Sequence, residues 1–127
     1  TGLYHDLADI WDDVLVVTMS EFGRTSQENG NRGTDHGEAS LCFTMGGAVN
    51  GGVYNCNRNN WSNGDLFSTS NGRYVAHRSD YRNIYNEILS RHLGDPDNQM
   101  DSIIPDYANL VSSDRNGYFD PLNFISA

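Results

Sequence analysis

The feature that most constrains the fold is the short apolar run from Val14 to Thr18, in which every residue except Leu15 is β-branched. A strand that is apolar on both faces is typical of the centre of a sheet, usually a parallel one covered on both sides. The segment before it, Gly2 to Asp13, has apolar residues at helical spacing. A helix, a short turn and a buried strand form an α/β unit, so the sequence predicts an α/β fold with a mostly parallel sheet.

Two polar stretches that contain glycine follow this strand, Ser20 to Thr25 and Gly33 to Gly37. Open α/β sheets bind ligands where their strands end, so these loops are the predicted site. Glu21, Asp35 and His36 supply carboxylate and imidazole groups, which suit a divalent cation such as Zn²⁺, Mn²⁺, Mg²⁺ or Ca²⁺. Such an ion could polarise a phosphoryl or carbonyl oxygen, or lower the pKa of bound water.

Arg24 lies in the first of these stretches and could hold an anionic substrate through paired hydrogen bonds. It is therefore the predicted catalytic side chain of the site. A simpler interpretation stays open, because carboxylates beside glycines are common turn formers and Arg24 can pair with Glu21 or Asp35 without any ligand. Among the other histidines, His77 is the one that lies in a loop suited to a site.

The rest of the chain adds a strand, a helix and two irregular parts. The alternation in 40–45 predicts a half-exposed strand. Ser79 to Leu93 carries an apolar helical stripe, with Ser79 as the predicted N-cap and Gly94 just past the end. The segment 55–71, rich in Asn, Ser and Gly, is predicted to be a surface loop pinned by aromatic side chains. Residues 97–127 hold short apolar clusters and are predicted to dock as an irregular tail.

Composition excludes two classes of partner. The 127-residue chain has a formal net charge of −9, and all its cationic side chains other than histidine are arginines. Such a surface repels nucleic acid and anionic membranes, which both need clustered positive charge. No apolar run reaches the roughly 18–20 residues that cross a bilayer. Cys42 and Cys56 match no zinc pattern and fit either one disulfide or two buried thiols.

Three motifs carry a resemblance to a known family: Thr18 to Thr25, Glu28 to Gly37, and the glycine-rich stretch Met45 to Gly52. With the helix that follows and the ending Ile103 to Phe124, they resemble the C-terminal part of the domain-of-unknown-function family fifteen hundred and one. The resemblance spans nearly the whole chain. It implies that residues 1–127 are the C-terminal portion of one domain and that the rest of a longer chain is a partner of this portion.

This bacterial family is similar to the alkaline phosphatase and sulfatase superfamily, which implies an α/β/α sandwich with metal ions at the C-terminal ends of its strands. In metal-dependent members a strand ends in an Asp-His pair, and a later His binds a second ion. Here Glu21 could replace the Asp, Phe22 stands in place of the His, and His36 looks like the later histidine. The resemblance implies metal-assisted hydrolysis of phosphate or sulfate esters by a protein exported through the twin-arginine route, to the periplasm or beyond.

Two other functions stay open. Phe22, the Asn-rich loop and the absence of lysine would suit a non-catalytic surface or extracellular protein that retained the fold and assembles into oligomers or polymers. Trp61, Tyr54 and Phe67 would suit a carbohydrate-binding module. The substrate class is accordingly an anionic small molecule or a polysaccharide.

Overall fold

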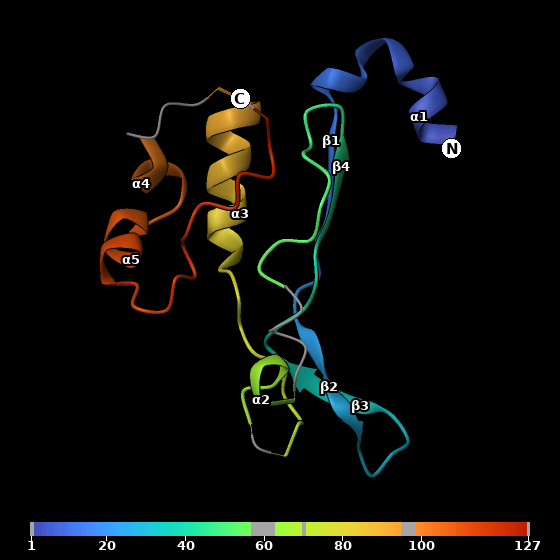
Figure 1. Cartoon of the computed structure of the whole chain (residues 1–127), viewed down its shortest axis with the longest axis vertical. Helices are drawn as coiled ribbons and strands as arrows, with labels where there is room; N and C mark the ends of the chain where they lie inside the picture. The colour runs from blue at the N-terminus through green and yellow to red at the C-terminus, as the bar shows by residue number, and fades with distance from the viewer. Residues whose placement is uncertain (1, 57–62, 70, 95–98, 127) are drawn as a thin grey trace. The chain divides into compact units, whose positions relative to one another are not determined.

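A computed structural model of the chain describes residues 2–56, 63–69, 71–94 and 99–126 (Figure 1). The chain forms two compact units, which we describe separately. The helical unit comprises Thr1–Val17, Thr44–Gly52 and Ser79–Ala127, and the hairpin unit comprises Thr18–Phe43 and Val53–Arg78. No helix in the described ranges is both long enough and apolar enough to cross a membrane.

In the described part of the chain, short helices come first and last, and the strands follow one another between them. It begins with α1 (Gly2–Asp6), the 3₁₀ helix η1 (Ala8–Asp13) and β1 (Leu15–Thr18). Then come β2 (Gly23–Glu28), β3 (Thr34–Gly37), β4 (Phe43–Gly46) and α2 (Asn63–Leu66). The last elements are α3 (Tyr81–Glu87), the π-helical turn η3 (Ile88–His92), α4 (Met100–Ile103) and α5 (Tyr107–Ser113). The predicted mixture of helix and strand is confirmed.

The predicted mostly parallel sheet is not present among the residues that the structure describes. Strand β1 pairs with β4, and β2 pairs with β3, in two separate two-stranded sheets. Phe43 donates its backbone N–H to Thr18 Oγ1 at 2.9 Å, whereas Gly46 at the other end of β4 lies against Val14, so β1 and β4 are antiparallel. The residues of β1, predicted to be buried on both faces, are half-buried or, at Thr18, exposed.

Helix α3 and η3 occupy the predicted helix 79–93, but its cap differs from the prediction. Asp80, not Ser79, is the N-cap, and its side chain accepts a hydrogen bond from Arg82 N–H. Gly94 has φ +69°, the left-handed conformation expected just after a helix. In the predicted apolar stripe, Tyr81, Tyr85 and Leu93 are 56%, 41% and 65% exposed, whereas Ile84, Ile88 and Leu89 are half-buried. The buried side chains of the helix are Asn83 and Glu87.

The C-terminal tail contains α4 and α5, so it is not wholly irregular. Its last part runs along α3 (Figure 1) and pairs with the segment 48–50. Asn50 N–H donates to Phe124 O at 2.8 Å, and Ser126 N–H donates to Ala48 O at 2.8 Å. Phe124 and Ile125 are almost completely buried and form the centre of the core of this unit.

The predicted surface loop 55–71 falls partly outside the described residues, including Trp61. Where the structure describes it, it contains α2 and an isolated bridge between Phe67 and Val75. Cys42 and Cys56 are both free thiols. Burial raises the pKa of the Cys42 thiol, so it carries little of the nucleophilic thiolate form.

Candidate anion-binding site

The candidate site is built on the antiparallel hairpin of β2 and β3, in which Arg24 lies opposite His36 and Gly23 opposite Gly37. The turn predicted from Asn29-Gly30 closes this hairpin. Asn29 N–H donates to Gly33 O at 2.8 Å, and Asn29 Oδ1 accepts from the N–H groups of Asn31 and Gly33 at 2.9 and 3.1 Å. The Asn29 side chain therefore stabilises the turn with two hydrogen bonds to its backbone.

The beginning of β2 requires glycine. Gly23 is buried, and a Cβ placed on it would collide with the backbone carbonyl group of Ala39. Across the hairpin, a Cβ on Gly37 would lie 3.2 Å from the carbonyl carbon of Arg24. Because both positions are in close backbone contact, the glycines fix the register that sets Arg24 beside His36.

Three side chains form an exposed cluster at this end of the hairpin: Phe22, Arg24 and His36. The His36 and Phe22 rings are stacked, with centroids 3.7 Å apart and planes inclined by 24°. The Arg24 guanidinium carbon lies 5.3 Å from the centre of the same Phe22 ring. Arg24 Nη1 also donates to Thr34 O at 2.6 Å, which leaves its other N–H groups for a ligand. We call these three residues the cationic cluster.

Asp35 belongs to a different set of contacts. Its Oδ2 accepts from Arg73 Nη2 in an ion pair, and its Oδ1 accepts from Asn29 Nδ2 at 2.9 Å. Consecutive residues of a strand point to opposite faces, so Asp35 and His36 cannot both reach one ion from the same side. Sequence reasoning missed Arg73 because it lies 38 positions away and no local pattern connects it to Asp35.

The predicted metal ligands are therefore not brought together. Glu21 is exposed and makes no ion pair with any described residue. Glu38 Oε2 lies 3.3 Å from Nε2 of His77, so this histidine pairs with Glu38 and not with the predicted ligands. The described part of the chain contains no group of three or more His, Cys, Asp or Glu side chains that could hold a metal ion. The residues Glu21, Asp35 and His36 do not fit a single divalent ion.

Comparison with known proteins gives one match. A family model described as Protein of unknown function (DUF1501) matches residues 1–104, most of the chain. The chain belongs to this family. No curated protein and no solved structure matches it. The family predicted from the three motifs is thus confirmed, while its link to phosphatases and sulfatases remains an expectation.

In this DUF1501 member, the cationic cluster offers hydrogen-bond donors that suit an anion. Arg24 offers two or more parallel N–H donors, the arrangement that suits the oxygens of a phosphate or sulfate group. His36 becomes a further cationic donor when its ring is protonated, and Phe22 supplies an apolar surface between them. Such a cluster can bind an anion that carries an apolar group. It contains no carboxylate of its own.

Proposed function

We propose that the cationic cluster recognises the anionic group of a phosphate or sulfate ester. The observation that carries this proposal is the placement of Arg24 and His36 opposite each other on the hairpin, both against Phe22. The chain carries a net charge of −9, which disfavours anions at its surface in general. The Arg24 guanidinium, with the His36 ring beside it, is therefore a selective feature of the surface.

The wider role in this proposal is that of the C-terminal portion of an exported phosphate or sulfate ester hydrolase, acting in the periplasm or outside the cell. Its support is the family membership and the anion-binding chemistry of the cluster. Because Glu21, Asp35 and His36 do not converge, we route no step of hydrolysis through a metal ion held by these residues. Arg24 and His36 would bind and orient the ester, and the remaining catalytic groups would come from elsewhere in the protein.

The test is a titration of the chain with phenyl phosphate and phenyl sulfate at low salt. Binding is monitored through the NMR signals of the Arg24 and His36 side chains. Benzyl alcohol serves as the uncharged comparison ligand. We expect both esters to bind and Arg24→Gln to weaken binding about tenfold, the loss of one charge-assisted hydrogen-bond pair. Phe22→Leu should weaken binding of the phenyl esters more than that of inorganic phosphate.

The matched control is Arg115→Gln. Arg115 is exposed and bonds only to backbone carbonyls of its own loop, at Ser112 and Asp114. Equal binding by the parent and by Arg24→Gln would contradict the proposal, as would equal loss in Arg115→Gln. Release of phenol from either ester above the rate in buffer would test the hydrolytic part separately, since binding can succeed where turnover fails.

A specific observation favours a second candidate function, a non-catalytic assembly protein. Three large apolar side chains of α3 and η3, Tyr81, Tyr85 and Leu93, are exposed. Contiguous exposed apolar patches are a feature of protein–protein contact surfaces. Sedimentation at increasing concentration would show association of the parent chain and its loss in Tyr85→Glu, and negative-stain microscopy would show any polymer. A monomer at every concentration tested would remove this candidate.

A further inference from the structure

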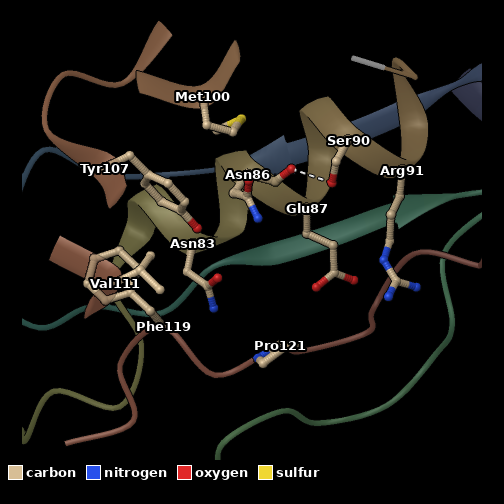
Figure 2. Close-up of a pocket in the computed structure, with 10 residues that line it drawn as sticks. All are labelled: Asn83, Asn86, Glu87, Ser90, Arg91, Met100, Tyr107, Val111, Phe119 and Pro121. Atoms are coloured by element: carbon tan, nitrogen blue, oxygen red, sulfur yellow. Dashed lines mark hydrogen bonds between the residues drawn. The ribbon is translucent and has the colours of Figure 1, made fainter. Parts of the chain in front are cut away.

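The helical unit contains a cavity of about 370 Å³ (Figure 2), and none of the residues that line it belongs to the cationic cluster. Helix α3 and η3 form one side of it, and α4, α5 and the segment 119–121 form the other. Its lining combines polar and apolar side chains: Asn83, Asn86, Glu87, Ser90, Arg91, Met100, Tyr107, Val111, Phe119 and Pro121. A volume of this size accommodates a ligand of one ring.

The polar part of the lining is an inward-facing stripe. Its five residues occur at intervals of three and four along α3 and η3, so they share one face of the helix. A helix at the surface of a globular unit normally turns such a face to water. Here the helix also changes to π-helical geometry at Ile88–His92, where Ser90 and Arg91 line the cavity. Single π turns occur frequently at functional sites.

The two charged residues of the stripe already have partners. Glu87 Oε2 and Oε1 accept from the N–H groups of Asn123 and Ile125 at 2.9 and 3.0 Å. Arg91 donates to Ile125 O at 3.3 Å and to Asn123 Oδ1 at 2.7 Å. Both charges are thereby fixed on the C-terminal segment, and they are opposite in sign. The cavity therefore favours an uncharged ligand.

The two carboxamides of the stripe keep unused hydrogen-bonding capacity. Asn83 is 4% exposed, and its Nδ2 donates to Asp120 O at 2.8 Å, but no described residue donates to its Oδ1. The Asn86 carboxamide bonds to no described residue, since only its backbone carbonyl is used, by Ser90 Oγ at 2.7 Å. Figure 2 shows both carboxamides directed into the same space. A buried acceptor without a donor costs free energy that a ligand hydroxyl would recover.

The remaining lining is apolar and partly aromatic. Tyr107 and Phe119 are in edge-to-face contact, with ring centroids 5.7 Å apart at 75°. Met100, Val111 and Pro121 complete this side of the cavity. All of these residues except Met100 lie beyond residue 104, where the match to the family model ends. The tail thus supplies the apolar side of the cavity and the family-matched helix supplies the carboxamides.

We propose that this cavity binds one uncharged pyranose ring, as a free monosaccharide or as the end unit of a glycan. Sugar hydroxyls both donate and accept hydrogen bonds, and so does a carboxamide, which makes Asn83 and Asn86 suitable partners. The C–H face of a pyranose packs on aromatic and aliphatic side chains such as Phe119 and Val111. This assignment does not depend on the cationic cluster, whose ligand is an anion.

The test is protein-observed NMR of the side-chain amide groups during titration with the methyl glycosides of glucose, galactose, mannose and N-acetylglucosamine. We expect at least one glycoside to shift the Asn83 and Asn86 side-chain signals. Asn86→Ala should weaken that binding about tenfold, because it removes one hydrogen-bonding group without touching the fold's own bonds. Val111→Trp, which fills the cavity, should abolish it.

The matched control is Asn116→Ala, an exposed asparagine of the same unit that does not line the cavity. It should bind the glycoside like the parent. The backbone spectrum of each variant reports whether it is folded, so a misfolded Val111→Trp leaves Asn86→Ala as the deciding variant. Three results would overturn the proposal: no shift with any glycoside, shifts that Asn86→Ala leaves unchanged, or shifts produced only by inorganic phosphate.

Discussion

In the hairpin unit, charged side chains lie at the surface, where the side chain of Asp35 is 49% exposed and pairs with Arg73. In the helical unit, Glu87 is 5% exposed and binds two backbone N–H groups of the C-terminal segment. A carboxylate therefore has a different role in each unit. A carboxylate at the surface gains little from pairing, whereas a buried one that satisfies backbone donors holds a segment in place.

The contrast extends to the apolar residues. In α3 and η3, Asn83 and Glu87 are buried, whereas Tyr81, Tyr85 and Leu93 are exposed. In the hairpin, it is small residues, Gly23 and Thr25, that are buried. In neither unit does the local sequence pattern alone determine which side chains are buried. The hairpin depends on close contact between backbone segments at its glycines. The helical unit depends on hydrogen bonds between α3 and the C-terminal segment. Each of the predictions below tests one side of this difference.

The largest effect is expected from Gly23→Ala in the hairpin unit. The new Cβ collides with the backbone carbonyl group of Ala39, so the backbone itself has to move. We expect a loss of about 3 kcal/mol in the free energy of unfolding of this unit, measured by urea denaturation. Gly30→Ala is the control, since a Cβ there meets nothing within 4 Å. Equal stability of the two variants would show that the described register is wrong.

The next largest effect is expected from Glu87→Gln in the helical unit. The amide keeps one acceptor but turns an N–H₂ group toward a backbone N–H of Asn123 or Ile125, leaving that donor buried and unpaired. We expect a loss of about 2 kcal/mol, measured by urea denaturation with near-ultraviolet circular dichroism. Glu28→Gln is the control, because Glu28 is exposed on β2. A loss in the control as large as that in Glu87→Gln would mean that burial does not decide the role of the carboxylate.

Sequence patterns predicted the parts that depend on neighbouring residues. The Asn29-Gly30 turn, the helix near 79–93 and its Gly94 end follow from local chemistry, and the family follows from contiguous motifs. The apolar stripe of that helix gave no sign that Asn83 and Glu87 are its buried residues. Glu87 bonds to the backbone of the C-terminal segment, where Phe124 and Ile125 are buried, and no local signal in the helix marks that pairing.

The candidate site shows the same limit. Arg24 and His36 were both predicted as site residues, because they follow a strand in a polar stretch. The strand alternation that places Asp35 and His36 on opposite faces was not apparent, since 33–37 was interpreted as a loop. In the structure that stretch is a strand, in which Asp35 and His36 lie on opposite faces, and Phe22 becomes part of the site because its ring stacks on His36.

A smaller, pH-dependent effect is expected at Asp114, which organises the loop before the C-terminal segment. Hydrogen bonds from the N–H groups of Phe119 and Asn116, both at 2.9 Å, lower the pKa of this carboxyl. Its contribution to stability is therefore present above the unfolded pKa of about 3.9 and is lost as pH falls through the lower folded value. Amide shifts of Phe119 and Asn116 should titrate together below pH 3.9 or so. The inflection should vanish in Asp114→Asn, and its persistence there would assign it to another group.

The smallest effects should come from two ion pairs, one in each unit. Asp35 and Arg73 are joined across the hairpin unit, with side chains 49% and 28% exposed. Asp80 and Arg82 form a bidentate pair at the start of α3, with bonds of 2.7 and 2.6 Å and side chains 17% and 30% exposed. Double-mutant cycles to alanine should give about 0.5 kcal/mol for the first pair and about 1 kcal/mol for the second.

The order of these two coupling energies tests whether the less exposed ion pair is the stronger one. The Asp80–Arg82 pair is less exposed and has two aligned bonds, and Arg82 also lies 5.7 Å from the centres of the Tyr81 and Phe119 rings. Raising the salt concentration to 1 M should reduce the Asp35–Arg73 coupling nearly to zero and leave more of the other, because screening acts mainly on exposed charges. A reversed order would mean that the hairpin, and not the helical unit, relies on its charged side chains for stability.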